Sequence, residues 1–289
     1  MVESVQSLLV DALRERALPL GGFVMAPGRR ERADATAWGV CALSRLAPGD
    51  ALIQPGRDSL RRIQTKRGVV PLTPETPAAW WPTPLALLAW DGAPEFDESR
   101  KRAVGFLLST GGITYDKDFS FDEHDSSIQG WPWITETYSW VEPTSIALLS
   151  LRLENATSQP RFREGVRMVK DRMIETGGWN YGNIKVFGKA LLPTPAPTGM
   201  ALCALRGEAD ESFVAKSLDY LAESCASVRT PISLAWAIMG LSAWGRRPDD
   251  ADALIRQSLA LQTKYGPFDT GLLAQLGMAA SNSFASGEE

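Results

Sequence analysis

The stretch Glu142-Pro-Thr-Ser-Ile-Ala-Leu-Leu-Ser-Leu151 contains the pattern that decides the fold. A Thr follows a loop, and an apolar segment with small residues at regular steps comes directly after that Thr. Five further copies, the last two weaker, lie at 34–43, 81–90, 196–205, 232–241 and 268–277. The four clear copies align on their Thr without a gap. Self-similarity of this kind indicates a repeat architecture.

Segments of a different character separate these copies. Phe162, Val166, Val169 and Met173 follow helical spacing and form an apolar stripe on one side of a helix. The copies themselves are apolar nearly all round, which is typical of helices that are buried between two layers or line an apolar cavity. The pattern predicts outer helices near 2–16, 50–65, 97–110, 159–176, 210–226 and 249–265, and inner helices near 34–46, 82–91, 143–154, 197–207, 231–245 and 269–281.

The apolar inner helices require the chain to close on itself. An open superhelix would leave one face of these helices in water, whereas a closed ring buries them. We therefore predict that residues 1–289 form a single all-α domain, an α/α toroid with six inner and six outer helices.

Composition narrows the class of protein. Of the 289 residues, 44% are hydrophobic and 22% are charged, values typical of a globular chain. The net charge is −4 and no basic stretch stands out, so a nucleic-acid partner is not expected. The first 16 residues lack the apolar core of a secretory signal, and no apolar run is long enough for a transmembrane helix. Three scattered cysteines, expected as free thiols, favour a cytoplasmic location.

The segments that precede the apolar helices resemble a known repeat, the Gln-x-x-x-Gly-x-Trp motif of squalene and terpene cyclases. Gln64–Val70 and Gln262–Phe268 keep the Gln and the Gly, and Gly177-Gly-Trp179 keeps the end of the motif. Gly21-Gly-Phe23 and Gly111-Gly-Ile113 are more degenerate copies. The chain is thus similar over nearly its whole length to the terpene cyclase and protein prenyltransferase superfamily. The resemblance implies one toroid and a hydrophobic isoprenoid or lipid ligand, but fold alone does not define chemistry.

Two acidic residues fall in one column of the aligned repeats, since Asp34 and Glu142 both lie two residues before the Thr. In class II terpene cyclases an Asp-rich run occupies this register, and its middle Asp protonates an alkene or epoxide. The resemblance therefore implies Glu142 as the acid and Asp34 as a second carboxylate. The flanking acids of that run are replaced here by Trp140 and Pro143. The alternative is that Glu142 only caps its helix, accepting hydrogen bonds from nearby backbone amides.

Aromatic residues are frequent in the loops that lead into the inner helices. Their rings can bind isoprenoid chains and stabilise cations. On this basis the candidate substrate-binding residues are Trp81, Trp131, Trp133, Tyr138, Trp140, Trp179 and Tyr181. The alternative is that some of them wedge between neighbouring hairpins, which is the role we favour for Trp179.

The sequence offers little for a metal. His124 is the only histidine, and a zinc site needs at least three protein ligands, so zinc-dependent prenyl transfer is disfavoured. The acidic segment 116–125 does not fit a calcium loop, because Phe121 and Ser127 occupy the positions of its Gly and Glu. We expect that segment to be solvated and predict no cofactor, with Mg²⁺ needed only if the ligand carries a diphosphate.

Two main functions follow from the sequence. The first is a toroid that binds a polyprenyl or triterpenoid chain in its central cavity, with class II cyclisation, an isomerase reaction, as its enzymatic form. The second is a non-catalytic lipid-binding or interaction module on a degenerate cyclase scaffold. A carbohydrate-active barrel is a third class, which would need two carboxylates on either side of a sugar. Peripheral contact with a membrane stays open.

Overall fold

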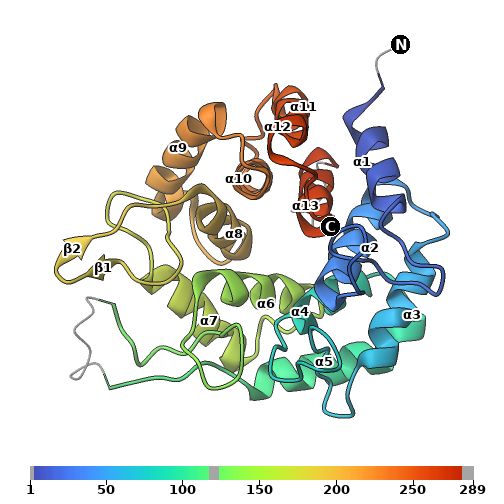
Figure 1. Cartoon of the computed structure of the whole chain (residues 1–289). Helices are drawn as coiled ribbons and strands as arrows, with labels where there is room; N and C mark the ends of the chain where they lie inside the picture. The colour runs from blue at the N-terminus through green and yellow to red at the C-terminus, as the bar shows by residue number, and fades with distance from the viewer. Residues whose placement is uncertain (1–2, 117–123, 282–289) are drawn as a thin grey trace.

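The computed structural model describes residues 3–116 and 124–281, and over these residues the helices alternate between an inner and an outer layer (Figure 1). The inner helices are α2 (Ala33–Leu46), α4 (Pro82–Ala89), α6 (Val141–Leu153), α8 (Pro195–Leu205), α10 (Pro231–Ala243) and α13 (Thr270–Ala280). The outer helices are α1 (Val5–Arg14), α3 (Ile53–Ile63), α5 (Asp97–Ser109), α7 (Pro160–Asp171), α9 (Glu211–Ser227) and α11 (Ala251–Ala260). The predicted α/α toroid is confirmed.

Four short elements complete the described chain. The 3-10 turn η1 (Pro94–Phe96) leads into α5, and α12 (Gln262–Tyr265) follows α11. The strands β1 (Lys185–Val186) and β2 (Lys189–Ala190) form a small antiparallel hairpin between α7 and α8.

The ring is closed by contacts between the two ends of the chain. Helix α13 packs against α2, and α1 packs against both α13 and α11 (Figure 1). The amide of Thr270 donates to the carbonyl of Met25 at 2.9 Å, and the Arg16 guanidinium donates to the carbonyl of Phe268 at 3.2 Å. The first and last hairpins therefore meet as neighbours, which an open superhelix would not allow.

The repeated Thr ties each incoming loop to its inner helix. In four repeats the buried hydroxyl accepts a hydrogen bond from a backbone amide of the preceding loop. The pairs are Phe23 with Thr36 at 2.9 Å, Val70 with Thr83 at 3.0 Å, Trp131 with Thr144 at 2.9 Å and Trp179 with Thr198 at 2.9 Å. In the third repeat the residue in this role is Trp131, so taking Gly111-Gly-Ile113 as the third copy of the motif was wrong. An insertion moves the functional copy closer to α6.

The glycines of the motif are required by backbone geometry. Gly68 and Gly177 have φ of 90° and 98°, a region that residues with a Cβ rarely adopt. A Cβ on Gly68 would lie 2.0 Å from the carbonyl oxygen of Arg102 in α5, and one on Gly177 would lie 2.7 Å from the backbone of Lys216 in α9. These turns therefore set the close approach of each loop to the following outer helix.

Candidate active site

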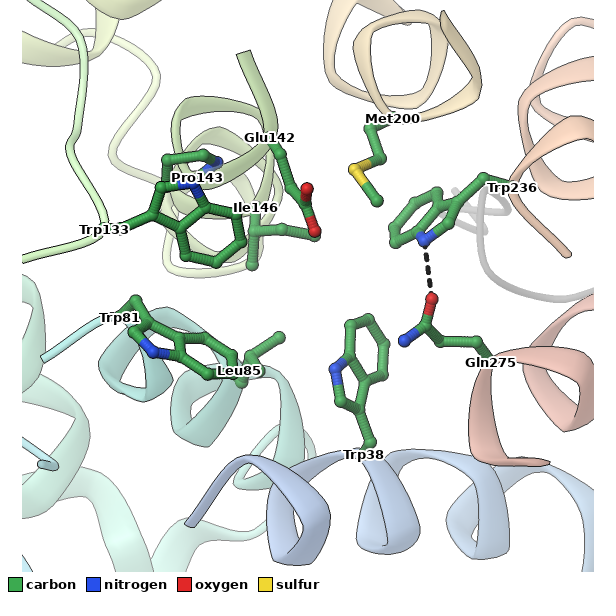
Figure 2. Close-up of a pocket in the computed structure, with 10 residues that line it drawn as sticks. All are labelled: Trp38, Trp81, Leu85, Trp133, Glu142, Pro143, Ile146, Met200, Trp236 and Gln275. Carbon is green, nitrogen blue, oxygen red and sulfur yellow. Dashed lines mark hydrogen bonds between the residues drawn. The ribbon is translucent and has the colours of Figure 1, made fainter. Parts of the chain in front are cut away.

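A cavity lies at the centre of the ring, where side chains from all six inner helices converge (Figure 2). Its lining residues are Trp38, Trp81, Leu85, Trp133, Glu142, Pro143, Ile146, Met200, Trp236 and Gln275. The space that the centre of a water molecule can reach is about 30 Å³. The cavity is thus nearly closed by its own side chains.

The floor of this cavity comes from a single position of the repeat. Five lining residues lie two positions after the Thr of their repeat or the residue aligned with it, and all five are buried: Trp38, Leu85, Ile146, Met200 and Trp236. Because the inner helices are related by the ring, the same position of these five helices points to the axis, whereas α13 contributes Gln275 from a different position of its repeat. Trp81 and Glu142, four residues earlier in their repeats, are half-buried and lie one helical turn closer to the amino ends.

Four indole rings surround the cavity as two edge-to-face pairs. The ring centroids of Trp81 and Trp133 are 5.4 Å apart at 83°, and those of Trp38 and Trp236 are 6.1 Å apart at 76°. Trp236 is oriented further by its indole N–H, which donates to the side-chain oxygen of Gln275 at 2.8 Å (Figure 2). These pairs present electron-rich faces and apolar edges to any bound group.

The carboxyl group of Glu142 reaches into the cavity from the first turn of α6 (Figure 2). It makes no hydrogen bond or ion pair with any other residue of the described chain, and burial raises its pKa to about 7. The capping alternative is wrong, since α6 has no side-chain cap and its Thr144 amide donates to the backbone carbonyl of Trp140 at 3.2 Å. Glu142 is therefore an acid without a partner among residues 3–116 and 124–281, and its pKa lies close to neutral pH.

The second predicted carboxylate is held elsewhere. Both carboxylate oxygens of Asp34 accept hydrogen bonds from the Arg32 guanidinium, at 3.0 and 2.6 Å. Burial raises the pKa of Asp34, and the bonds from Arg32 oppose that shift. Asp34 does not line the cavity. The expectation that Asp34 and Glu142 share one site is thus corrected, because the neighbouring Arg32 ties Asp34 to the start of α2.

The predicted aromatic residues divide into three groups. The first group, Trp81 and Trp133, lines the cavity, and the other predicted aromatic residues do not. Trp131 and Trp179 are fully buried wedges between hairpins, and their indole N–H groups donate to the carbonyls of Leu107 at 3.0 Å and Val169 at 2.7 Å. The guanidinium of Arg161 covers the ring of Trp131, 3.9 Å from its centroid. These two tryptophans stabilise the outer seam rather than the cavity.

The third group lies on the surface. Tyr138, Trp140 and Tyr181 are exposed and do not line the cavity. The hydroxyl of Tyr138 donates to that of Tyr115 at 2.7 Å. The sequence analysis did not identify Trp38, Trp236 or Gln275 as lining residues. Trp38 and Trp236 lie at the repeat position that supplies the floor, so an alignment of that position would have identified these two.

The described residues hold no cluster of three His, Cys, Asp or Glu side chains that could bind a metal. Most of the acidic segment predicted to be solvated, residues 117–123, lies outside the described residues. Cys41, Cys203 and Cys225 are buried free thiols. Within residues 3–116 and 124–281, no helix combines the length and apolar character needed to cross a bilayer.

No protein-family model and no curated protein sequence matches the chain. Solved structures do match it over almost its whole length and define its class as an α/α toroid. A type II terpene cyclase from Scytonema, in complex with the substrate geranylgeranyl dihydroxybenzoate, is 12% identical with a TM-score of 0.62 over 97% of both chains.

Proteins named for carbohydrate substrates match equally well. An α-1,6-mannanase of Salegentibacter is 10% identical, with a TM-score of 0.62 over 98% of this chain and 99% of the mannanase. An α-amylase from Clostridium perfringens is 11% identical, with a TM-score of 0.63 over 96% of this chain and 98% of the amylase. At these identities the likeness shows the fold alone, and the site must supply the function.

Proposed function

We propose that the protein binds an isoprenoid ligand in its central cavity. The observation that carries this proposal is the lining, in which four indole rings and four apolar side chains surround one carboxyl group. Such surfaces favour apolar, unsaturated chains through burial and contact with ring faces. The similar terpene cyclase from Scytonema, with its geranylgeranyl substrate, supports an isoprenoid over other apolar ligands.

We propose binding without cyclisation, the non-catalytic alternative raised by the sequence. Protonating an alkene needs a strong acid, whereas burial raises the pKa of Glu142 to about 7 and no neighbouring side chain of the described chain hydrogen-bonds to it. Asp34 cannot assist, since Arg32 holds it away from the cavity. Hydrolysis of a glycoside is disfavoured for a related reason, because the described residues place one carboxylate in the cavity where two are required.

The size of the cavity sets a condition on this proposal. Ligand pockets usually measure roughly 300–1,000 Å³, far more than the about 30 Å³ found here. A prenyl chain therefore enters only if side chains at the mouth move. Trp81 and Trp133 are the half-buried members of the lining that can do so without disturbing the floor.

Binding is tested by titrating the purified protein with geranylgeraniol and following tryptophan fluorescence. Ile146→Phe, which adds volume to the floor, should weaken binding by at least about tenfold, because the chain and the new ring compete for the same space. Trp140→Phe is the matched control, since Trp140 lies outside the cavity, and it should bind as the wild type does. Equal affinity in wild type and Ile146→Phe would place the ligand elsewhere.

Turnover is tested separately by incubating wild type and Glu142→Gln with squalene or geranylgeranyl diphosphate and analysing the extracted lipids. Mg²⁺ is included for the diphosphate, which is the one ligand expected to require it. The proposal expects no cyclised product from either protein. A product made by wild type and lost in Glu142→Gln would establish cyclisation instead.

A further inference from the structure

This inference rests on the proposed cavity and names the chemistry of a group bound in it beside Glu142. We propose that the cavity binds an organic cation, a quaternary or tertiary alkylammonium group, between the two tryptophan pairs, with the Glu142 carboxylate as its counter-ion.

The first argument concerns charge. Glu142 is the only ionisable residue among the ten described residues that line the cavity, and no cationic side chain of the described part of the chain forms an ion pair with it. Other buried carboxylates have such a partner, as Asp34 has Arg32. An unpaired carboxylate in an apolar site is costly, and a cationic ligand would remove that cost whereas a neutral ligand would not.

The second argument concerns the rings. Cations are attracted to the electron-rich faces of aromatic rings, most strongly to Trp, and cages of such rings recognise alkylated ammonium groups. Trp81 and Trp133 lie on one side of the cavity and Trp38 and Trp236 on another, with the Glu142 carboxyl group between them (Figure 2). Rings and carboxylate thus surround the same small space.

The third argument selects an alkylated over a primary ammonium group. A primary ammonium has three N–H donors, which must all find acceptors when it is buried. Only the Glu142 carboxylate and the side-chain oxygen of Gln275, which accepts from Trp236, offer side-chain acceptors in the described lining, and the remaining walls include Leu85, Ile146 and Met200. Methyl groups on nitrogen need no acceptors. Space of about 30 Å³ for the centre of a water molecule is too small for such a head group, so Trp81 and Trp133 at the mouth move aside for it as they do for a prenyl chain.

The test compares two probes of the same shape, choline and its uncharged analogue 3,3-dimethylbutan-1-ol, by isothermal titration calorimetry. Wild type should bind choline at least about tenfold more tightly than the analogue. Glu142→Gln should lose most of that preference. Below pH 7 the choline affinity should fall by about tenfold per pH unit, because Glu142 must release a proton to pair with the cation.

The contribution of the tryptophan rings to choline binding is measured with Trp133→Leu, which keeps an apolar wall but removes the aromatic face. Trp133→Leu should weaken the binding of choline and leave the binding of the analogue unchanged. Trp140→Leu, which lies outside the cavity, should change the affinity for neither probe. Circular dichroism verifies that each variant folds, and Trp81→Leu replaces Trp133→Leu if the latter does not.

The outcomes separate this inference from the proposed function. Equal binding of the two probes, no binding of choline, or full choline affinity in Glu142→Gln would each overturn the cation site. If geranylgeraniol still binds in those cases, the isoprenoid proposal stands. If choline binds as expected and geranylgeraniol does not, the cation site stands and the isoprenoid proposal falls.

Discussion

At the scale of single residues, Glu142 is the most unusual group in the molecule. Its carboxyl group shares a cavity with four indole rings and has no hydrogen-bonding partner in the described chain. Trp131 and Trp133 are two residues apart and have different roles. The first is a buried wedge that donates to Leu107, and the second, two residues later, lines the cavity.

Glu142 should make the stability of the protein depend on pH. Its pKa rises from 4.5 to about 7 on folding, so the folded state binds the extra proton between these values and stability falls as pH rises through that window. The full penalty, reached above pH 7, is about 3 kcal/mol. Glu142→Gln should remove it.

The measurement is the free energy of unfolding in urea at several pH values for wild type and Glu142→Gln. The gain from the substitution should be near zero at pH 4 and largest at pH 8. A difference that does not change with pH would show that Glu142 is solvated in the folded protein.

At the scale of elements, the hairpins are joined by indole wedges and by the repeated Thr. Trp179 is fully buried and its N–H donates to the carbonyl of Val169 near the end of α7. The predicted helix ranges agree with the observed ones to within a few residues, because the apolar periodicity is a local property of each segment.

Trp179→Phe should destabilise the protein by about 2 kcal/mol, since it leaves the carbonyl of Val169 without its donor and creates a small cavity. Ligand binding in the central cavity should not change. Urea unfolding and the geranylgeraniol titration check the two parts, with exposed Trp140→Phe as the control. Lost binding in a folded Trp179→Phe protein would contradict the wedge role.

At the scale of the whole molecule, the decisive feature is the seam between the last and first hairpins. Thr270, at the start of α13, is buried, and both its amide and its hydroxyl donate to carbonyls of the loop before α2. Residues near position 25 and near position 270 thereby share hydrogen bonds that hold the ring closed.

Thr270→Val should weaken this seam by about 1–2 kcal/mol, because the carbonyl of Val24 loses its donor while the side-chain shape is kept. Hydrogen exchange followed by mass spectrometry should show faster exchange in residues 20–32 and 266–280 together. Thr83→Val is the control, because it removes the corresponding hydroxyl in the second repeat, away from the seam. It should speed hydrogen exchange first in its own hairpin. Faster exchange on one side of the seam only would indicate that the ring is not cooperative there.

The sequence by itself determined the helices, their two layers and the ring, because each follows from a repeat whose apolar pattern is local and whose burial demands closure. It also placed Glu142 at the amino end of an inner helix. The tertiary structure decided which side chains face the axis. Asp34 and Glu142 share a repeat position, yet Arg32 holds only Asp34. Trp133 reaches the cavity from the loop between Trp131 and α6, where edge-to-face packing against Trp81 sets its direction.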